Sequence, residues 1–342
     1  MEDGLIKIPD SPWPPMTLDK WLEMIATRDP PLWYIDGILP ADGVGVISGP
    51  PKSFKTYFAM MLARVAATGQ SLPPVLTWKV GRVPMKVWFL EFEGSQGGNA
   101  DAWRKCEKGC GWQANHANIY WMHRRWDFSL SDPAWVDRAK QFVRENEIEL
   151  IFVNTFGEAV GTIKSEQDSQ AVKAPLQALA QIQLETPRHE GFVFYVHHTR
   201  KSAGEEDNDT AEGIDAALRG SSGLAAGYLH HLAFRHTPDG EGLWLWTRSK
   251  QDEPRYFAVN WKIDKDEGFA KLDMNEWRVN VPLELPDLEG YSRELRGERV
   301  YTETDLKNLW KAPKPVVRAI MRQLRGAGMV EGTAKGVKRT GG

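Results

Sequence analysis

Short apolar runs alternate with longer amphipathic stretches between Gly43 and His197. The short runs have the length of buried strands, and the stretches between them repeat their apolar residues at helical spacing. This alternation predicts an α/β fold on a mostly parallel sheet, in which ligands bind beyond the carboxyl ends of the strands. The expected strands are Gly43–Ser48, Val87–Phe92, Leu150–Val153 and Gly191–His197, and the expected helices cover 55–68, 99–109, 133–146 and 170–184.

Two polar or proline-rich segments divide the rest of the chain. Residues 201–214 hold almost no apolar side chains and predict a loop, and strands are expected after it at 228–234, 243–247 and 256–261. Residues 281–290 carry two prolines and predict a linker. We therefore expect an N-terminal arm over 1–31 with a short amphipathic segment at Leu18–Ala26, a core domain over 32–280, and a separate module over 291–342.

The most informative motif directly follows the first expected strand. Its residues are Gly49, Pro50, Pro51, Lys52, Ser53, Phe54, Lys55 and Thr56. They match the phosphate-binding pattern G-x-x-x-x-G-K-[ST] except at Phe54, which stands where the pattern has its last glycine and whose side chain must turn away from the phosphates. In such a loop backbone N–H groups surround the phosphates, Lys55 adds a positive charge, and the Thr56 hydroxyl binds Mg²⁺. The alternative is a structural turn that contains Lys-Thr by chance.

Two carboxylates end the second expected strand, Glu91 and Glu93. Alternation along a strand sends both side chains to the same face, near the position of a γ-phosphate and its attacking water. Glu93 lies nearer the edge of the sheet, so we expect it to be the base that activates the water. The alternative interpretation is a pair of surface carboxylates at a strand end.

The third and fourth expected strands each end in a neutral polar residue. Asn154 follows the third strand, where a nucleotide hydrolase commonly has an acidic residue that holds Mg²⁺ through water. An amide can orient that water but brings no negative charge. His198 follows the fourth strand and is a candidate hydrogen-bond sensor of the γ-phosphate, with a packed structural histidine as the alternative.

Charge is distributed unevenly along the 342 residues, whose net charge is only -3. Residues 291–342 carry +7, which leaves -10 for the remainder. Helices are expected there at Thr302–Trp310 and Pro315–Gly326. The second has an apolar face of Val317, Ile320, Met321 and Leu324, and its basic residues, with the preceding turn, are Lys314, Arg318, Arg322 and Arg325. This pattern predicts a small winged-helix or helix-turn-helix module that contacts DNA, with a solvated face on a subunit-docking domain as the alternative.

The remaining composition favours a cytoplasmic protein. The N-terminus lacks a secretory pattern, and no stretch approaches the roughly 18 apolar residues of a membrane span. Both cysteines, Cys106 and Cys110, lie in one helical pattern, so a disulfide framework is excluded. A zinc site with His116 and His123 is allowed by spacing but is disfavoured by that helical pattern.

Taken together, these residues resemble the RecA-like P-loop NTPases of the hexameric plasmid replicative helicase RepA and its phage and mobile-element relatives, and more distantly the DnaB-type helicases. The resemblance covers roughly residues 32–262 and rests on four segments: ILPADGVGVISGPPKSFKT, VWFLEFEGS, VHHTRK and ALRGSSGLAAGYLHHLAFRH. It implies ATP and Mg²⁺ as ligands. It also implies a ring, with six subunits as the expected number, in which basic residues of a neighbour complete each site.

The resemblance also assigns candidate residues beyond the phosphate loop. Arg248 and Lys250 occupy a place similar to the Lys-x-Arg pair that DnaB-like relatives supply to the neighbouring site; ordinary solubilising charges are the alternative. Arg200, Lys201 and Arg219 flank a loop that resembles the central-channel loops that grip single-stranded DNA. The acidic interior of that loop limits the expected DNA contacts to its basic ends.

Two functional hypotheses follow. The first is a ring-forming ATPase that acts on DNA in replication of a plasmid, phage or other mobile element, as a helicase. The second is a nucleotide-binding but weakly hydrolysing DNA-binding protein, such as a helicase loader, assembly factor or regulator, and it is favoured by Asn154 and the acidic loop. In addition, the arm over 1–31 is a candidate for docking on a neighbouring subunit.

Overall fold

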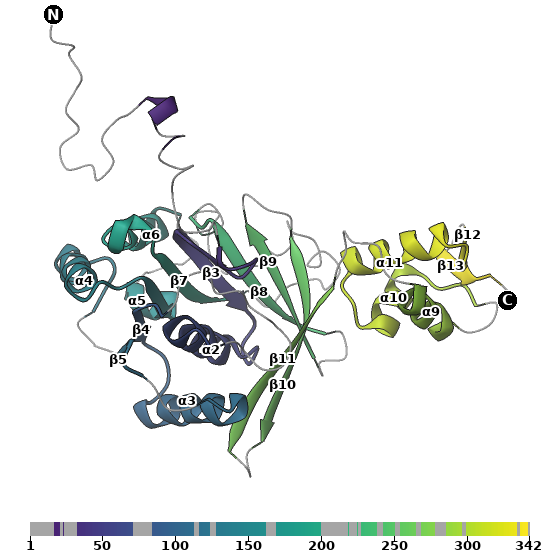
Figure 1. Ribbon diagram of the computed structural model, residues 1–342, viewed down its shortest axis with the longest axis horizontal. Helices are drawn as coiled ribbons and strands as arrows, with labels where there is room; N and C mark the ends of the chain where they lie inside the picture. The colour runs from purple at the N-terminus through teal and green to yellow at the C-terminus, as the bar shows by residue number, and fades with distance from the viewer. Residues whose placement is uncertain are drawn as a thin grey trace, which may run out of the picture.

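The computed structural model describes residues 17–20, 23, 33–70, 84–112, 116–123, 128–161, 169–199, 218, 224, 227–237, 242–249, 254–264, 268–277, 285–295, 299–333 and 336–340. Within them, a nine-stranded sheet has the order β11-β10-β9-β8-β3-β7-β6-β4-β5 (Figure 1). Its strands are β3 Gly43–Gly49, β4 Val87–Glu91, β5 Ile119–His123, β6 Leu150–Asn154, β7 Phe192–His198, β8 His230–His236, β9 Leu243–Ser249, β10 Arg255–Asp264 and β11 Phe269–Trp277.

Parallel pairing dominates the sheet, as the sequence pattern predicted. The strands β8, β3, β7, β6, β4 and β5 pair in parallel, and β9, β10 and β11 extend the sheet by antiparallel pairing. The seven predicted strands are confirmed with ends shifted by three residues at most. The outermost strands, β5 and β11, were not predicted, although β5 is as long as β6 and apolar residues alternate with polar ones along β11.

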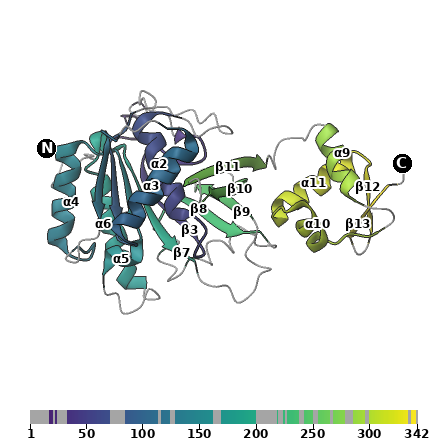
Figure 2. The ribbon, with the colours of Figure 1, turned by 90° about the horizontal axis from the view of Figure 1, so that it is seen from below.

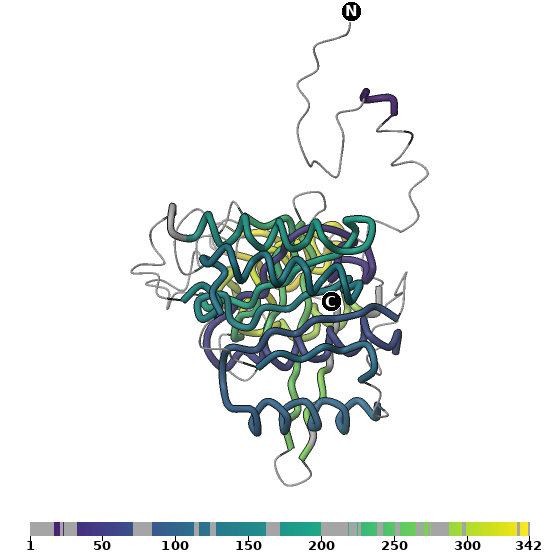
Figure 3. Tube along the Cα trace, turned by 90° about the vertical axis from the view of Figure 1, so that its left-hand side faces the viewer, coloured from purple at the N-terminus to yellow at the C-terminus, as the bar shows by residue number. Residues whose placement is uncertain are grey.

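Helices cover both faces of the sheet. On one face lie α2 Lys55–Thr68 and α3 Gln96–Cys110, and on the other lie α4 Pro133–Asn146, α5 Phe156–Val160 and α6 Ser169–Gln183 (Figures 2 and 3). The four predicted helices are confirmed, and α5 is additional. A small separate sheet, β1 Trp33–Ile35 with β2 Leu39–Pro40, and a 3-10 turn at Pro187–His189 complete this part of the described chain.

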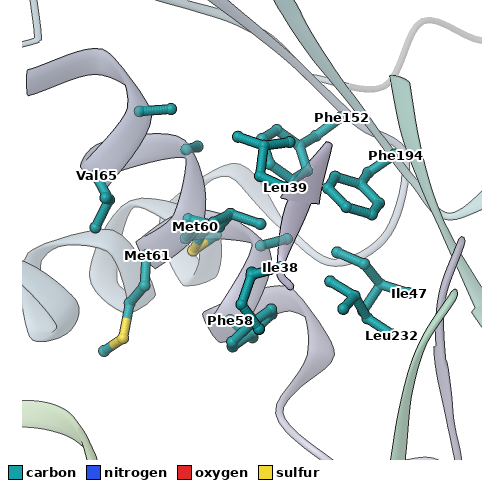
Figure 4. Close-up of a cluster of buried hydrophobic side chains, with 14 of the residues drawn as sticks. Ile38, Leu39, Ile47, Phe58, Met60, Met61, Val65, Phe152, Phe194 and Leu232 are labelled. Atoms are coloured by element: carbon teal, nitrogen blue, oxygen red, sulfur yellow. The ribbon is translucent and has the colours of Figure 1, made fainter. Parts of the chain in front are cut away.

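The helix that carries the phosphate loop is anchored in the largest apolar cluster. Every residue of α2 from Phe58 to Ala67 is buried, and Figure 4 shows Phe58 and Met60 near Ile38, in the same cluster as Ile47 of β3. Phe152 of β6 and Phe194 of β7 lie in the same cluster. Since apolar burial contributes roughly 25 cal/mol per Å², this packing fixes the start of α2 relative to the strand ends.

The helix ends follow local sequence signals. Asp132 accepts a hydrogen bond from the Ala134 backbone N–H at 2.9 Å, with Pro133 as the first residue of α4. Thr302 and Asp305 form a reciprocal capping box at the start of α10. These capping interactions satisfy backbone donors that have no partner within the helix.

The C-terminal module contains three helices and a short antiparallel sheet. They are α9 Leu285–Glu294, α10 Glu303–Trp310, α11 Lys314–Gly326, β12 Val330–Thr333 and β13 Gly336–Arg339. The two predicted helices and the apolar face of the second are confirmed, although Met321 is only partly buried. The linker prediction over 281–290 is wrong from Leu285 onward. Helix α9 begins at Leu285, and Leu288 is buried in the module.

The module contacts the sheet through tryptophans of β9. Trp244 and Trp246 are buried in one cluster with Leu306, Trp310 and Val317 of the module. The Trp244 indole donates a hydrogen bond to the Lys311 carbonyl at 2.8 Å. Three of the chain's 15 tryptophans, Trp244, Trp246 and Trp310, therefore lie in the cluster that joins the sheet and the module.

Some expectations fall on residues outside the described ranges. Of the amphipathic segment at Leu18–Ala26, residues 18–20 and 23 are described, and they are helical. The loop expected at 201–214 lies outside the described residues altogether. Among the helices that are described, none combines the length and apolarity of a membrane span.

The contact between β9 and the module predicts a stability effect. Trp244→Ala should lower the free energy of unfolding by about 3–5 kcal/mol, because it removes a buried ring and the hydrogen bond from its indole to the Lys311 carbonyl. Urea denaturation measures the change, with Leu309→Ala as the control because Leu309 is 38% exposed in the same module. A Trp244→Ala variant no less stable than the control would contradict the prediction.

Candidate nucleotide-binding site

Four strand ends meet at one edge of the sheet. Because β3, β7, β6 and β4 are parallel neighbours, their carboxyl ends lie together. Gly49 is in register with His198, and Glu91 is in register with Asn154. The structure therefore brings the phosphate loop and the polar residues that follow the other three strands to a common place.

The phosphate loop contains left-handed backbone at two residues, Lys52 and Phe54. Phe54 has φ 58° at the N-cap of α2, a conformation that costs about 1–2 kcal/mol for a residue with a Cβ. Its ring stacks on Trp261 of β10 at 5.3 Å between centroids and contacts Tyr57 at 6.0 Å. The predicted orientation of Phe54 is thus explained: the ring packs in an aromatic cluster on β10, which helps offset the backbone cost.

The loop also has a close contact that requires glycine. A Cβ on Gly49 would lie 2.7 Å from Ser53 Oγ and 2.9 Å from the Phe234 Cβ. Ser53 donates from that hydroxyl to the Pro50 carbonyl at 2.8 Å. Pro51 and Lys52 are exposed at the tip of the loop.

Lys55 is folded back onto the loop. Its ammonium donates to the Gly49 carbonyl at 3.0 Å, to the Pro50 carbonyl at 2.8 Å and to Ser53 Oγ at 3.3 Å. Burial lowers the pKa of Lys55 to about 8, and the negative charge of Glu93 opposes this shift. The ammonium is therefore partly desolvated and held by neutral acceptors, which phosphate oxygens would replace with stronger charge-assisted bonds.

Thr56, Asn154 and Glu91 form a chain of contacts behind the loop. Asn154 Nδ2 lies 3.2 Å from Thr56 Oγ1 and 2.6 Å from Glu91 Oε2. Asn154 and Glu91 are both completely buried, and burial raises the pKa of Glu91 to about 8. The peptide bond between Asn154 and Thr155 is cis.

The residues fit a Mg²⁺ ion at Thr56. The hydroxyl of Thr56 is a suitable oxygen ligand, and it contacts Asn154. Asn154 Oδ1 is buried and has no hydrogen-bond partner among the described residues. An acceptor of this kind suits a water molecule of a metal's hydration shell.

The two carboxylates have different environments. Glu91 is 0% exposed, whereas the side chain of Glu93 is 51% exposed and lies 3.7 Å from the His198 Nε2. His198 is the main cause that holds the pKa of Glu93 below its usual value, and Lys55 adds to the effect. Glu93 is therefore an ionised carboxylate that water can reach, and Glu91 is a buried group with structural partners.

His198 faces Glu93 with one nitrogen and the protein interior with the other. Its Nδ1 atom is buried and without a hydrogen-bond partner among the described residues. The neighbouring His197 is buried against Phe156. Of the two consecutive histidines, His198 is the one that the structure brings to the site.

Arg248 does not lie at this edge. It pairs with His231 across β9 and β8, and His231 in turn is in register with Val46, three residues before the loop begins at Gly49. Arg248 is partly exposed near the end of β9, which runs antiparallel to β8. Lys250 and the expected loop residues Arg200, Lys201 and Arg219 lie outside the described residues.

The basic residues of the C-terminal module differ in their availability. Arg318 is bound by Glu303 of α10 through two hydrogen bonds of 2.7 and 3.0 Å. Arg322 and Arg325 are exposed on α11, and Lys314 is half-buried at its start. Arg318 is therefore paired with an acidic residue, whereas Arg322 and Arg325 are exposed at the surface.

The cysteines form no metal site. Both thiols are buried on α3, and burial raises the pKa of Cys110 to about 12. His116 instead contacts Glu107 at 2.7 Å. Among the residues that the structure describes, no group of three or more His, Cys, Asp or Glu has metal-binding geometry.

Sequence reasoning missed two contacts of the site. The pairing of Glu91 with Asn154 depends on β4 and β6 being neighbours in the sheet, although α3, β5 and α4 separate them in the chain. The stack of Phe54 on Trp261 joins the loop to a strand more than 200 residues later. The signals present in the sequence were a second carboxylate at a strand end and an aromatic residue in place of glycine.

A comparison with family models agrees with this geometry. A family model described as AAA domain matches residues 12–204, which is more than half of the chain. The matched region contains the phosphate loop, both carboxylates, Asn154 and His198, and it ends before β8. No curated protein matches the chain.

The left-handed Phe54 predicts an unusual order of stabilities. Phe54→Ala should destabilise the protein by about 1–3 kcal/mol, because the variant lacks the stack on Trp261 while the backbone penalty remains. Phe54→Gly should be more stable than Phe54→Ala by about 1 kcal/mol, because glycine removes that penalty. Urea denaturation of the two variants gives the difference, and a glycine variant equal to or below the alanine variant would contradict this account.

Proposed function

The chain belongs to the family described as AAA domain and carries an ATP-binding P-loop ATPase domain, and from this premise we propose that it hydrolyses ATP to act on DNA. The observation that carries the proposal is the convergence of Lys55, Glu93 and His198 at the edge where the loop meets α2. A phosphate chain bound by the loop would place its last phosphoryl group between a cation and an accessible carboxylate.

The side chains have separate roles in the proposed reaction. Lys55 exchanges the carbonyls of Gly49 and Pro50 for oxygens of the β- and γ-phosphates and stabilises their charge. Glu93 accepts a proton from the water that attacks the γ-phosphorus, while the bond to the β-phosphate oxygen breaks. His198 lies beside Glu93 and donates a hydrogen bond to the carboxylate or to the γ-phosphate.

Mg²⁺ would be held by Thr56 directly and by Asn154 through water. When bound, it neutralises charge on the phosphate oxygens. The orphaned Oδ1 atom of Asn154 supports this assignment.

The C-terminal module supports the proposed action on DNA. Residues 291–342 carry a net charge of +7 against -10 for the rest of the chain, and the three helices of the module followed by a two-stranded sheet are the order of elements in a winged helix. The exposed Arg322 and Arg325 are the proposed phosphate contacts, and Arg318 is secondary because Glu303 already binds it. Single-stranded DNA bound by Arg200, Lys201 and Arg219 in a central channel remains part of the proposal.

A ring of subunits, with six as the expected number, would complete the site. Arg248 lies away from its own phosphate loop, which suits a residue that acts on a neighbour's nucleotide, and Lys250 is its proposed companion. The arm over 1–31 is proposed to dock on the adjacent subunit. In this form the protein is a replicative helicase of a plasmid, phage or other mobile element.

A second function is favoured by one specific observation. Strand β6 ends in Asn154, so this strand end lacks the acidic residue common in rapid hydrolases. A protein of this kind binds nucleotide, hydrolyses it weakly and serves as a helicase loader, assembly factor or regulator. The rate of ATP turnover in the presence of DNA separates the two proposals.

Turnover tests the proposed roles directly. We expect DNA-stimulated ATP hydrolysis by the full chain, and Glu93→Gln should lower kcat by at least about 100-fold while nucleotide binding persists, because the variant has no base. Lys55→Ala should abolish nucleotide binding as well. Glu145→Gln, an exposed change on α4, is the control for removing a carboxylate. A Glu93→Gln variant as active as the control would overturn the assignment of Glu93, and a wild-type chain that binds ATP without turnover would favour the second function.

Salt dependence tests the proposed DNA binding by the module. Replacing Arg322 and Arg325 by alanine should weaken binding to a DNA duplex and reduce the slope of log K against log salt by about 1 for each phosphate that the variant no longer neutralises. Arg318→Ala is the matched control, because Glu303 neutralises that guanidinium. Equal slopes for the double variant and the control would contradict the predicted role of Arg322 and Arg325.

A further inference from the structure

Glu91 is a buried carboxylate that the proposed reaction does not use. It is the last residue of β4 and is completely buried, although it lies only two residues before the accessible Glu93. Burying a carboxylate is costly unless its oxygens have good partners. Both of its oxygens have one, and each partner belongs to the nucleotide site.

The first partner of Glu91 is the amide of Asn154. The two residues are in register on neighbouring parallel strands, and Asn154 Nδ2 donates to Glu91 Oε2 at 2.6 Å. The same nitrogen lies 3.2 Å from Thr56 Oγ1. Glu91 is therefore linked through one amide to the hydroxyl that is expected to bind Mg²⁺.

An asparagine amide has a donating end and an accepting end, and its neighbours decide how the two ends are placed. Both oxygens of Glu91 act as acceptors, Oε1 for the Glu93 N–H and Oε2 for Asn154 Nδ2, so the nitrogen end of the amide faces Glu91. This leaves Oδ1, the accepting end, without a partner among the described residues. A buried acceptor left unpaired costs about 1–3 kcal/mol, and a metal-bound water would satisfy it.

The second partner of Glu91 is the backbone of Glu93. The Glu93 N–H donates to Glu91 Oε1 at 2.8 Å. This bond fixes the backbone just beyond the end of β4, from which the side chain of Glu93 extends toward His198. A single carboxylate thus holds the residue expected at the metal's water shell and the residue expected to activate water.

We propose that Glu91 is a positioning residue that holds the Asn154 amide with its oxygen available to the water shell of Mg²⁺, so that the Glu91–Asn154 pair replaces the single acidic residue usual at this strand end. The inference rests on the proposed function, since it assumes that the site binds Mg²⁺ with ATP. Residues that orient metal ligands through hydrogen bonds commonly change metal affinity by about 10–100-fold when they are removed.

The pair predicts a pattern of variants that a merely structural role would not produce. In Glu91→Gln the new amide can either donate to Asn154 or accept from it. Either end of the Asn154 amide can then face residue 91, so its orientation is no longer fixed. Asn154→Asp places two carboxylates in contact and should also weaken the site. The double variant Glu91→Gln with Asn154→Asp restores a carboxylate and amide pair with the two groups exchanged.

The experiment measures binding of a fluorescent ATP analogue to the full-length chain, in EDTA and across a titration of MgCl₂. We expect Glu91→Gln to raise the Mg²⁺ concentration required for half-maximal enhancement by about 10-fold or more. The dissociation constant in EDTA should stay within about twofold of the wild-type value, because Lys55 and the loop are unchanged. The double variant should recover most of the Mg²⁺ response, and Glu145→Gln should behave as wild type.

Other outcomes overturn the proposal in distinguishable ways. A wild-type Mg²⁺ response in Glu91→Gln overturns it, and so does an equal loss of binding in EDTA and in Mg²⁺, which would assign Glu91 to folding alone. Thermal unfolding of each variant, followed in parallel, shows whether the folded chain is present. If wild type binds no nucleotide under either condition, the proposed function itself fails, whereas wild-type binding with an unaltered variant refutes only the role of Glu91.

Discussion

The parallel pairing of β3, β7, β6 and β4 is the constraint on which the site depends. Four strands that end at one edge bring together residues that lie far apart in the chain, from Gly49 to His198. Each strand is held by apolar side chains on both faces, with α2 and α3 on one side and α4, α5 and α6 on the other. The position of the site is consequently set by the order and direction of the strands in the sheet.

The loop departs from its usual sequence and remains compatible with phosphate binding. Phe54 takes the left-handed conformation that glycine normally adopts, and its ring packs on Trp261 instead of closing the loop. The antiparallel extension of the sheet through β10 supplies that packing surface. The strands added to the parallel core therefore stabilise the nucleotide loop, and β9 in the same extension carries the C-terminal module through Trp244.

Sequence patterns predicted the strands and helices of the core because each is coded locally. The apolar runs of the strands and the helix cap at Asp132 can be recognised from residues that are close together in the sequence. The edge strands, the start of α9 at Leu285 and the buried state of Glu91 depend on which elements become neighbours. The sequence favoured Glu93 over Glu91 as the base that activates water, and the structure shows Glu93 exposed and Glu91 buried, but the sequence did not reveal what Glu91 binds.

In the free protein the Lys55 ammonium binds the carbonyls of its own loop, and we expect it to bind the phosphates of a nucleotide instead when one is present. A crystal structure of the chain with Mg²⁺ and a non-hydrolysable ATP analogue tests it most directly. The account predicts that the Lys55 ammonium leaves the carbonyls of Gly49 and Pro50 for phosphate oxygens, while the Phe54 stack on Trp261 stays in place. A nucleotide bound elsewhere, with Lys55 still on the loop carbonyls, would contradict it.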